Sequence, residues 1–122
     1  MAGLVLAGPL AAAQEATPVS WDHDGTTFSG YLVHDPGASG PRPGLVMVPN
    51  WMGVNDSAVD KARAIADRGY VVLVADMYGK GVRPTSTEEA SAAARSVYAD
   101  REAMRGRINA ALDTLRAQAG EV

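Results

Sequence analysis

Cysteine is missing from all 122 positions of this chain. Its absence excludes a disulfide framework, a zinc site built on thiolates and a cysteine nucleophile within these residues. Basic residues are also sparse, because 11 Lys and Arg face 14 Asp and Glu, which gives a net charge of -3, and they form no run. A nucleic-acid surface needs Lys and Arg clustered on one face, so we expect no nucleic-acid partner.

Long apolar stretches are missing as well. The chain opens on an uncharged, mostly apolar segment, residues 1–13, but a helix that spans a bilayer needs about 20 such residues. We therefore expect no membrane association. The segment ends in Ala11-Ala12-Ala13, a small-x-small pattern that signal peptidase accepts, so we interpret it as a signal-peptide remnant and expect a periplasmic or secreted form that begins at Gln14. Basic residues normally open a signal peptide; since none is present, either the true start lies upstream of Met1 or the segment is an ordinary tail.

Nucleotide-binding loops are lacking too. Gly79-Lys80-Gly81 has no Ser or Thr after its lysine, as a Walker loop requires, and a dinucleotide fingerprint starting at Gly79 would need a glycine where Pro84 stands. His23 and His34 are not near a carboxylate pattern that indicates a metal site. We expect neither a cofactor nor a metal.

A nucleophile elbow, Gly-x-Ser-x-Gly or its cysteine counterpart, is absent. Ser39 follows Gly37 by two residues, but Pro41 stands where the second glycine should be. No serine of this chain therefore fits the strand-to-helix turn on which such a nucleophile is placed.

The first secondary-structure element that the sequence predicts is a β-hairpin over Thr17–His34. Polar and apolar residues alternate before Asp24-Gly25, a dipeptide typical of tight hairpin turns, and β-branched and aromatic residues follow it. The Pro/Gly/Ser-rich segment 35–43 then predicts a loop.

Two continuous apolar runs follow, residues 44–48 (GLVMV) and 70–75 (YVVLVA). Runs without alternation are typical of strands buried on both faces of a parallel sheet. A helix is predicted between them, capped by Asp56 or Ser57 with Asp60 as a capping-box partner, and stopped by Gly69. Its apolar face is formed by Val59, Ala62, Ile65 and Ala66. Strand, helix and strand make a right-handed βαβ crossover.

The remainder predicts helix. Ser86-Thr87-Glu88-Glu89 is a second capping box, an alanine-rich region follows it, and an apolar stripe closes the pattern: Met104, Ile108, Ala111, Leu112 and Leu115. The layout is α/β, about four strands in a sheet that begins antiparallel and turns parallel. Asp76, at the end of the second buried strand, is either a loop cap or a catalytic acid, and the loop cap is the favoured interpretation.

Residues 48–55 (VPNWMGVN) and 75–81 (ADMYGKG) follow the two buried strands, and together they resemble the dienelactone hydrolase family. The resemblance covers most of residues 17–118. It implies the N-terminal half of an α/β-hydrolase fold: a β-hairpin, then a parallel βαβ unit and a long C-terminal helical region. Residues 14–122 would thus form a partial domain of an ester or lactone hydrolase.

The resemblance also implies site residues. Trp51 would donate its backbone N–H to the oxyanion hole, as the loop after this strand does in the fold. Asn50 stands where many members have a glutamate beside the nucleophile, and it cannot carry that charge. Lys80 stands where a basic residue of the family meets the substrate carboxylate, although a plain solvated loop lysine is the favoured interpretation. For Trp51 the alternative is simple packing of the loop against the core. The nucleophile, acid and histidine of the triad should all lie downstream of Val122, so we expect this chain alone to be inactive.

Three functional hypotheses remain open at this stage. The chain is part of an ester or lactone hydrolase acting on a small molecule, a non-catalytic half-domain that binds a partner, or one half of a split hydrolase whose missing C-terminal half is a separate chain. An isolated half would leave a parallel sheet edge uncovered, which weighs against the half-domain.

Overall fold

The hairpin predicted from the sequence forms one side of the sheet. The computed structural model describes residues 14–38 and 40–118, so the predicted signal-peptide segment lies outside the described residues. Strands β1 (Glu15–His23) and β2 (Thr26–His34) pair antiparallel, from Glu15 opposite His34 to His23 opposite Thr26. Asp24 and Gly25 both have positive φ, 51° and 80°, as a two-residue type I′ turn requires. The hairpin is confirmed and begins two residues earlier than expected.

The two apolar runs form the parallel part of the sheet. Strands β3 (Gly44–Met47) and β4 (Val71–Val74) pair in parallel, and β4 pairs antiparallel with β2, which gives the order β1-β2-β4-β3. The predicted change from antiparallel to parallel pairing is therefore confirmed. Among the described residues β3 pairs with β4 alone, so its outer edge is an edge of the sheet.

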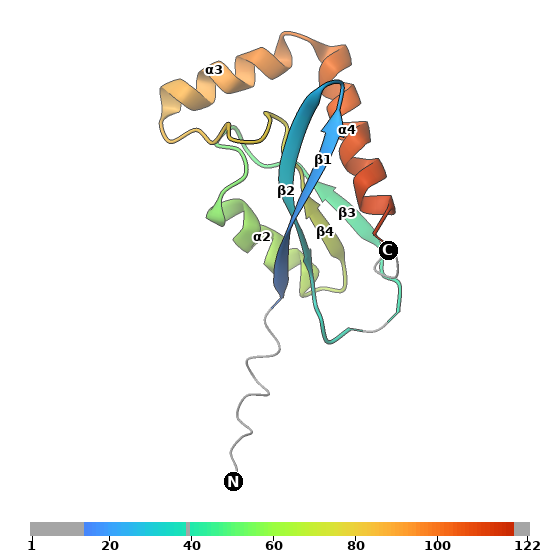
Figure 1. Ribbon diagram of the computed structural model, residues 1–122. Helices are drawn as coiled ribbons and strands as arrows, with labels where there is room; N and C mark the ends of the chain where they lie inside the picture. The colour runs from blue at the N-terminus through green and yellow to red at the C-terminus, as the bar shows by residue number, and fades with distance from the viewer. Residues whose placement is uncertain (1–13, 39, 119–122) are drawn as a thin grey trace.

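Helices cover both faces of this sheet (Figure 1). Helix α2 (Asp56–Ala66) packs against β2 and β4 on one face, and α4 (Arg101–Arg116) crosses β1, β3 and β4 on the other. Alternate residues of β4 belong to the two cores, because Val72 and Val74 join the cluster with α2 while Leu73 joins the one with Leu115 of α4. Burial on both faces explains why this strand shows no polar alternation.

The capping residue of α2 differs from the expected one. Asn55 caps the helix, with extended backbone angles and a side-chain oxygen that accepts the amide of Ala58 at 2.9 Å. The prediction of Asp56 or Ser57 was therefore wrong by one or two positions, since three adjacent residues could all act as caps. Asp60 is no capping-box partner; it makes a surface ion pair with Arg63 at 3.2 Å. Of the predicted apolar face, Ile65 is only partly buried.

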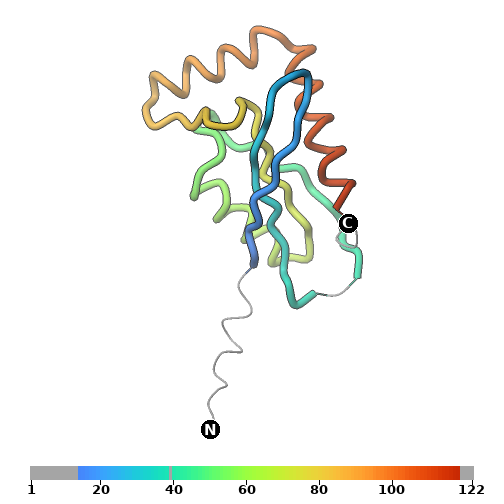
Figure 2. Tube along the Cα trace, in the orientation of Figure 1, coloured from blue at the N-terminus to red at the C-terminus, as the bar shows by residue number. Residues whose placement is uncertain are grey.

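The C-terminal helical region divides into two helices. Helix α3 (Thr87–Tyr98) begins at the predicted cap Ser86, and α4 begins after Asp100, which accepts the amide of Ala103. Figure 2 shows the chain turning sharply between them, so that α3 lies across the end of the sheet while α4 runs along its face. No described helix is long and apolar enough to cross a membrane.

Candidate functional site

Two loops meet where the parallel strands end. One follows β3 and contains residues 48–53, and the other follows β4 and contains residues 75–79. The carboxyl ends of parallel strands point to the same edge of a sheet, which is where ligands bind in open α/β folds. These loops also carry the residues that the sequence singled out, so the candidate site is placed at this edge.

The loop after β3 is a tight turn organised by Asn50. Its carbonyl accepts the amide of Gly53 at 2.9 Å, and its side-chain oxygen accepts the amide of Met52 at 2.9 Å. Gly53 has a φ of +78°, a conformation that favours glycine, and a Cβ there would lie 3.3 Å from the ring of Tyr78. Within the described residues the Trp51 amide donates no hydrogen bond. The turn thus leaves one backbone donor without an internal acceptor.

The loop after β4 is organised by Asp76, which is 2% exposed. One carboxylate oxygen accepts the amides of Tyr78 and Gly79 at 2.9 and 3.0 Å, and the other accepts the amide of Ser29 on β2 at 3.0 Å. Arg83 lies 3.6 Å from the carboxylate as its counter-charge. These contacts match the loop-cap interpretation of Asp76, because both oxygens are occupied by the protein itself.

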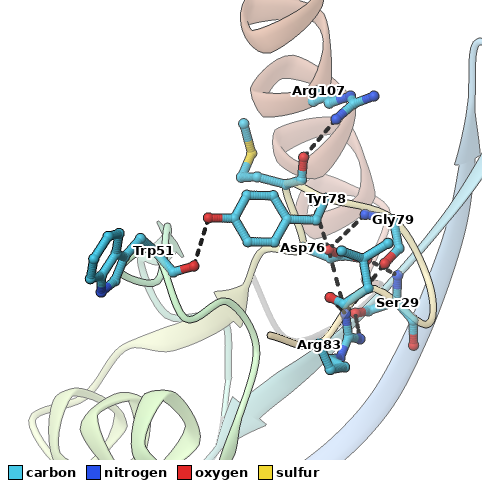
Figure 3. Close-up of polar contacts among 9 residues, drawn as sticks. Ser29, Trp51, Asp76, Tyr78, Gly79, Arg83 and Arg107 are labelled. Atoms are coloured by element: carbon cyan, nitrogen blue, oxygen red, sulfur yellow. Dashed lines mark hydrogen bonds and ion pairs between the residues drawn. The ribbon is translucent and has the colours of Figure 1, made fainter. Parts of the chain in front are cut away.

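Two arginines hold the same loop from opposite sides (Figure 3). Arg83 donates to the carbonyl of Ser29 at 2.8 Å, which ties the end of the loop to β2. Arg107 of α4 donates to the carbonyl of Met77 at 2.8 Å, and its guanidinium lies 5.1 Å from the centre of the Phe28 ring. The loop is therefore fixed to the hairpin and to α4 at once.

Tyr78 connects the two loops. Its hydroxyl donates to the carbonyl of Trp51 at 2.7 Å, and Figure 3 shows the phenol reaching across to that carbonyl while the indole of Trp51 points away. Burial, with a smaller contribution from Tyr98, raises the pKa of the Tyr78 hydroxyl above its ordinary value of 10.0. The hydroxyl therefore keeps its proton, and remains a donor, at neutral pH.

A pocket of about 160 Å³ lies between these loops and the C-terminal helices. The two loops supply part of its lining, and apolar side chains of α3 and α4 supply the rest. The lining residues are Val48, Pro49, Asn50, Trp51, Gly53, Ala75, Met77, Tyr78, Ala94, Val97, Tyr98, Met104 and Ile108. None of them is charged, so this part of the site favours an uncharged, apolar group.

The structure brings two of the three predicted site residues together. Asn50 and Trp51 line the pocket, and Trp51 is 46% exposed. Lys80 lies outside the lining; its side chain is exposed and its amide donates to Thr27 at 2.9 Å. Both histidines lie in the hairpin, and no group of three described His, Asp or Glu side chains could hold a metal ion.

Sequence reasoning missed the two pocket residues of α4 and the role of Tyr78. Met104 and Ile108 were assigned to the helical stripe, but they line the pocket, whereas Ala111 and Leu115 of the same stripe enter the core. Tyr78 and Trp51 are 27 positions apart, and no local pattern indicates a hydrogen bond over such a separation.

Comparison with known proteins gives a family match and similar solved structures. Residues 28–122 match the profile of the dienelactone hydrolase family. A dienelactone hydrolase-like promiscuous phosphotriesterase, P91, from metagenomic libraries is 38% identical with a TM-score of 0.83, and a structure named m3DLH is 34% identical with a TM-score of 0.82. Each comparison covers 90% of this chain and 46% of the other, so the chain spans about half the length of these relatives. Comparison with curated protein sequences gives no significant match.

Proposed function

Because the chain belongs to the dienelactone hydrolase family, we propose that it forms the N-terminal part of an ester or lactone hydrolase. The proposed role of this part is to supply one oxyanion donor, the Trp51 amide, and one wall of the substrate pocket. The reaction is an acyl transfer to water, in which negative charge develops on the carbonyl oxygen of the substrate.

The observation that carries this proposal is the unused amide of Trp51 in a loop that lines an apolar pocket. Trp51 is 46% exposed, so water satisfies this N–H in the free protein, and an arriving oxyanion would take the place of that water. Its place after a parallel strand is where the α/β-hydrolase fold takes one of its two oxyanion donors.

The remaining machinery is proposed to come from polypeptide beyond these residues. The chain has no cysteine, and none of its serines stands in an elbow pattern. His23 and His34 lie in the hairpin, not in the loops that form the pocket. A missing C-terminal half could pair with the open edge of β3 and place a nucleophile beside Trp51. Without it we expect no turnover, because nucleophile, base and orienting group must act together.

Asn50 and Lys80 have distinct proposed roles. Asn50, which lies next to the proposed position of the nucleophile, supports the oxyanion turn through its bond to the Met52 amide and supplies no charge. Lys80 is exposed outside the pocket, so a contact with a substrate carboxylate requires a substrate that extends beyond the pocket rim. The uncharged lining itself favours the apolar part of such a substrate.

A split hydrolase is the alternative that the open β3 edge and the exposed Val48 next to it favour, because a second chain would cover that edge. A non-catalytic half-domain would leave the edge uncovered, which weighs against it. The test compares residues 14–122 with the complete product of the reading frame that contains them, using an activated aryl ester and heat-denatured protein as the control. We expect saturable hydrolysis by the complete product and none by residues 14–122. A folded complete product without activity would contradict the hydrolase proposal. Turnover by residues 14–122 that a single Ser or His substitution abolishes would contradict the proposed division of the site.

Secretion is proposed from residues 1–13, whose Ala11-Ala12-Ala13 precedes Gln14. We expect the mature protein recovered from the periplasm or medium to begin at Gln14, as measured by intact mass. Recovery with Met1 still attached would show that the segment is a tail.

A further inference from the structure

We propose that Tyr78 is a positioning residue for the oxyanion turn, which it holds through the carbonyl of Trp51. This inference rests on the proposed function, since it assigns Tyr78 a task in a site whose donor is the Trp51 amide. Tyr78 itself need not touch the reacting atoms; it acts through the turn.

The peptide between Trp51 and Met52 is the central peptide of the Asn50–Gly53 turn. Turns of types I and II differ mainly by a flip of this peptide, which is easy in an exposed loop. Here it is held at both ends: its carbonyl accepts the Tyr78 hydroxyl at 2.7 Å, and its N–H donates to the side chain of Asn50 at 2.9 Å. A flip would break both bonds, so the two contacts fix the peptide that follows Trp51. Trp51 is thereby held on its carbonyl side, which restrains the direction of its own N–H.

Tyr78 is itself firmly held, which a positioning residue needs. Its amide is bound by Asp76, its ring packs against Gly53, and the neighbouring Met77 carbonyl is bound by Arg107. Within the turn itself the bonds are the two made to Asn50, and the Trp51 side chain is 46% exposed. Tyr78 thus transfers the rigidity of the β4 loop to the more exposed β3 loop.

The test is Tyr78→Phe in the complete enzyme, which removes the hydroxyl and keeps the ring that packs on Gly53. Preorganised donors contribute to the transition state more than to substrate binding. We therefore expect kcat to fall about 10-fold while KM changes less than about two-fold, and a phosphonate transition-state mimic to bind more weakly by a similar factor. Asn50→Ala, which removes the other bond to the same peptide, should show the same split between kcat and KM. Tyr70→Phe is the matched control, because Tyr70 precedes β4 at the opposite end of the sheet from the pocket.

A second measurement reads the hydrogen bond in the folded variant directly and does not depend on turnover. The chain has two tryptophans, so carbonyl-labelled tryptophan gives two carbon signals, one of which belongs to Trp51. Loss of the hydrogen bond should shift the Trp51 signal in Tyr78→Phe and leave it in place in Tyr70→Phe. An unchanged Trp51 signal, or a kcat within two-fold of the wild type, would overturn the role of Tyr78 while leaving the hydrolase proposal standing. A folded but inactive wild-type enzyme would overturn both.

Discussion

Among single residues, Asp76 is the buried charged side chain that organises the loop after β4. Its two oxygens accept three amides from β2 and its own loop, and Arg83 balances its charge. An asparagine keeps the shape but replaces one oxygen by an NH₂ group, which cannot accept an amide. We expect Asp76→Asn to lower the free energy of unfolding by about 2–4 kcal/mol, because a buried donor and the Arg83 charge lose their partner.

Urea unfolding checks this prediction, with Asp60→Asn as the control. Asp60 makes an exposed ion pair with Arg63, and its loss should cost less than about 1 kcal/mol. Equal effects of the two substitutions would show that the buried network adds no stability.

Tyr78 should titrate later than an ordinary tyrosine. Its pKa is raised by burial, so the folded protein holds this proton more tightly than the unfolded chain, whose tyrosines ionise near 10.0. The resulting stabilisation is present below that pH and is lost as the pH rises through the folded pKa. Ultraviolet titration of the four tyrosines should show a late-titrating group that is missing in Tyr78→Phe. A titration curve in which that variant loses an early group would contradict the direction of the shift.

Sequence alone could place Asn50 and Trp51 beside the pocket, because a distinctive loop motif and its position after a buried strand act together. Their roles in catalysis stay predictions. Sequence alone could not assign Tyr78 its partner or decide between the two roles of Asp76. Those roles depend on which backbone groups reach the side chain after folding, and Ser29 is 47 residues away from Asp76.

Among the elements, β2 and β4 approach each other closely at Gly30. A Cβ at this position would lie 2.0 Å from the carbonyl oxygen of Val74, and the ring of Trp21 would be 3.2 Å away. Because the closest atom belongs to the backbone of a buried strand, it cannot move aside without disturbing the sheet. We expect Gly30→Ala to lower the free energy of unfolding by more than about 3 kcal/mol.

Chemical denaturation measures the free energy of unfolding of Gly30→Ala, and Gly37→Ala serves as the control. Gly37 lies in the loop after β2, where the nearest atom to an added Cβ is the flexible Asp35 carboxylate at 3.3 Å. Its substitution should change stability by less than about 1 kcal/mol. A Gly30→Ala protein as stable as the loop variant would mean that the strands can separate at little cost.

The elements most easily predicted were those with strong local signals. The Asp24-Gly25 turn and the two apolar runs each allow few alternatives, and all three were confirmed. The cap of α2 was wrong because Asn55 stands beside Asp56 and Ser57, and all three are good caps. The division of the last helical region was missed because Asp100 alone marks it, with no Gly or Pro nearby.

In the whole molecule, the outer edge of β3 is one of the two sheet edges that no described strand covers. Its backbone groups face away from β4, and Val48, which follows it, is 50% exposed. An open, apolar edge recruits further strands. We expect residues 14–122 to associate with increasing concentration in sedimentation velocity, and Val48→Lys to reduce this association.

Val82→Lys is the control for charge, because Val82 is 43% exposed on the loop after β4. Its neighbour Arg83 contacts Ser29 of β2, a strand that β4 separates from β3. The control should associate as the unmodified chain does. A chain that stays monomeric at every concentration, or two lysine variants with equal effects, would show that the edge is not the cause.

Helix α4 connects the pocket, whose lining can be varied, with the hydrophobic core, where substitutions cost stability. Its first half presents Met104 and Ile108 to the pocket, and its second half presents Ala111 and Leu115 to the core. A straight helix moves as one unit, so its two halves cannot shift independently. The width of the pocket therefore depends on how α4 packs around Leu115, about two turns from Ile108. Helix α3 also lines the pocket, through Ala94 and Val97, yet belongs to neither core cluster. For an engineer who wishes to admit bulkier substrates, α3 is therefore the wall to redesign, and α4 is the wall to leave alone.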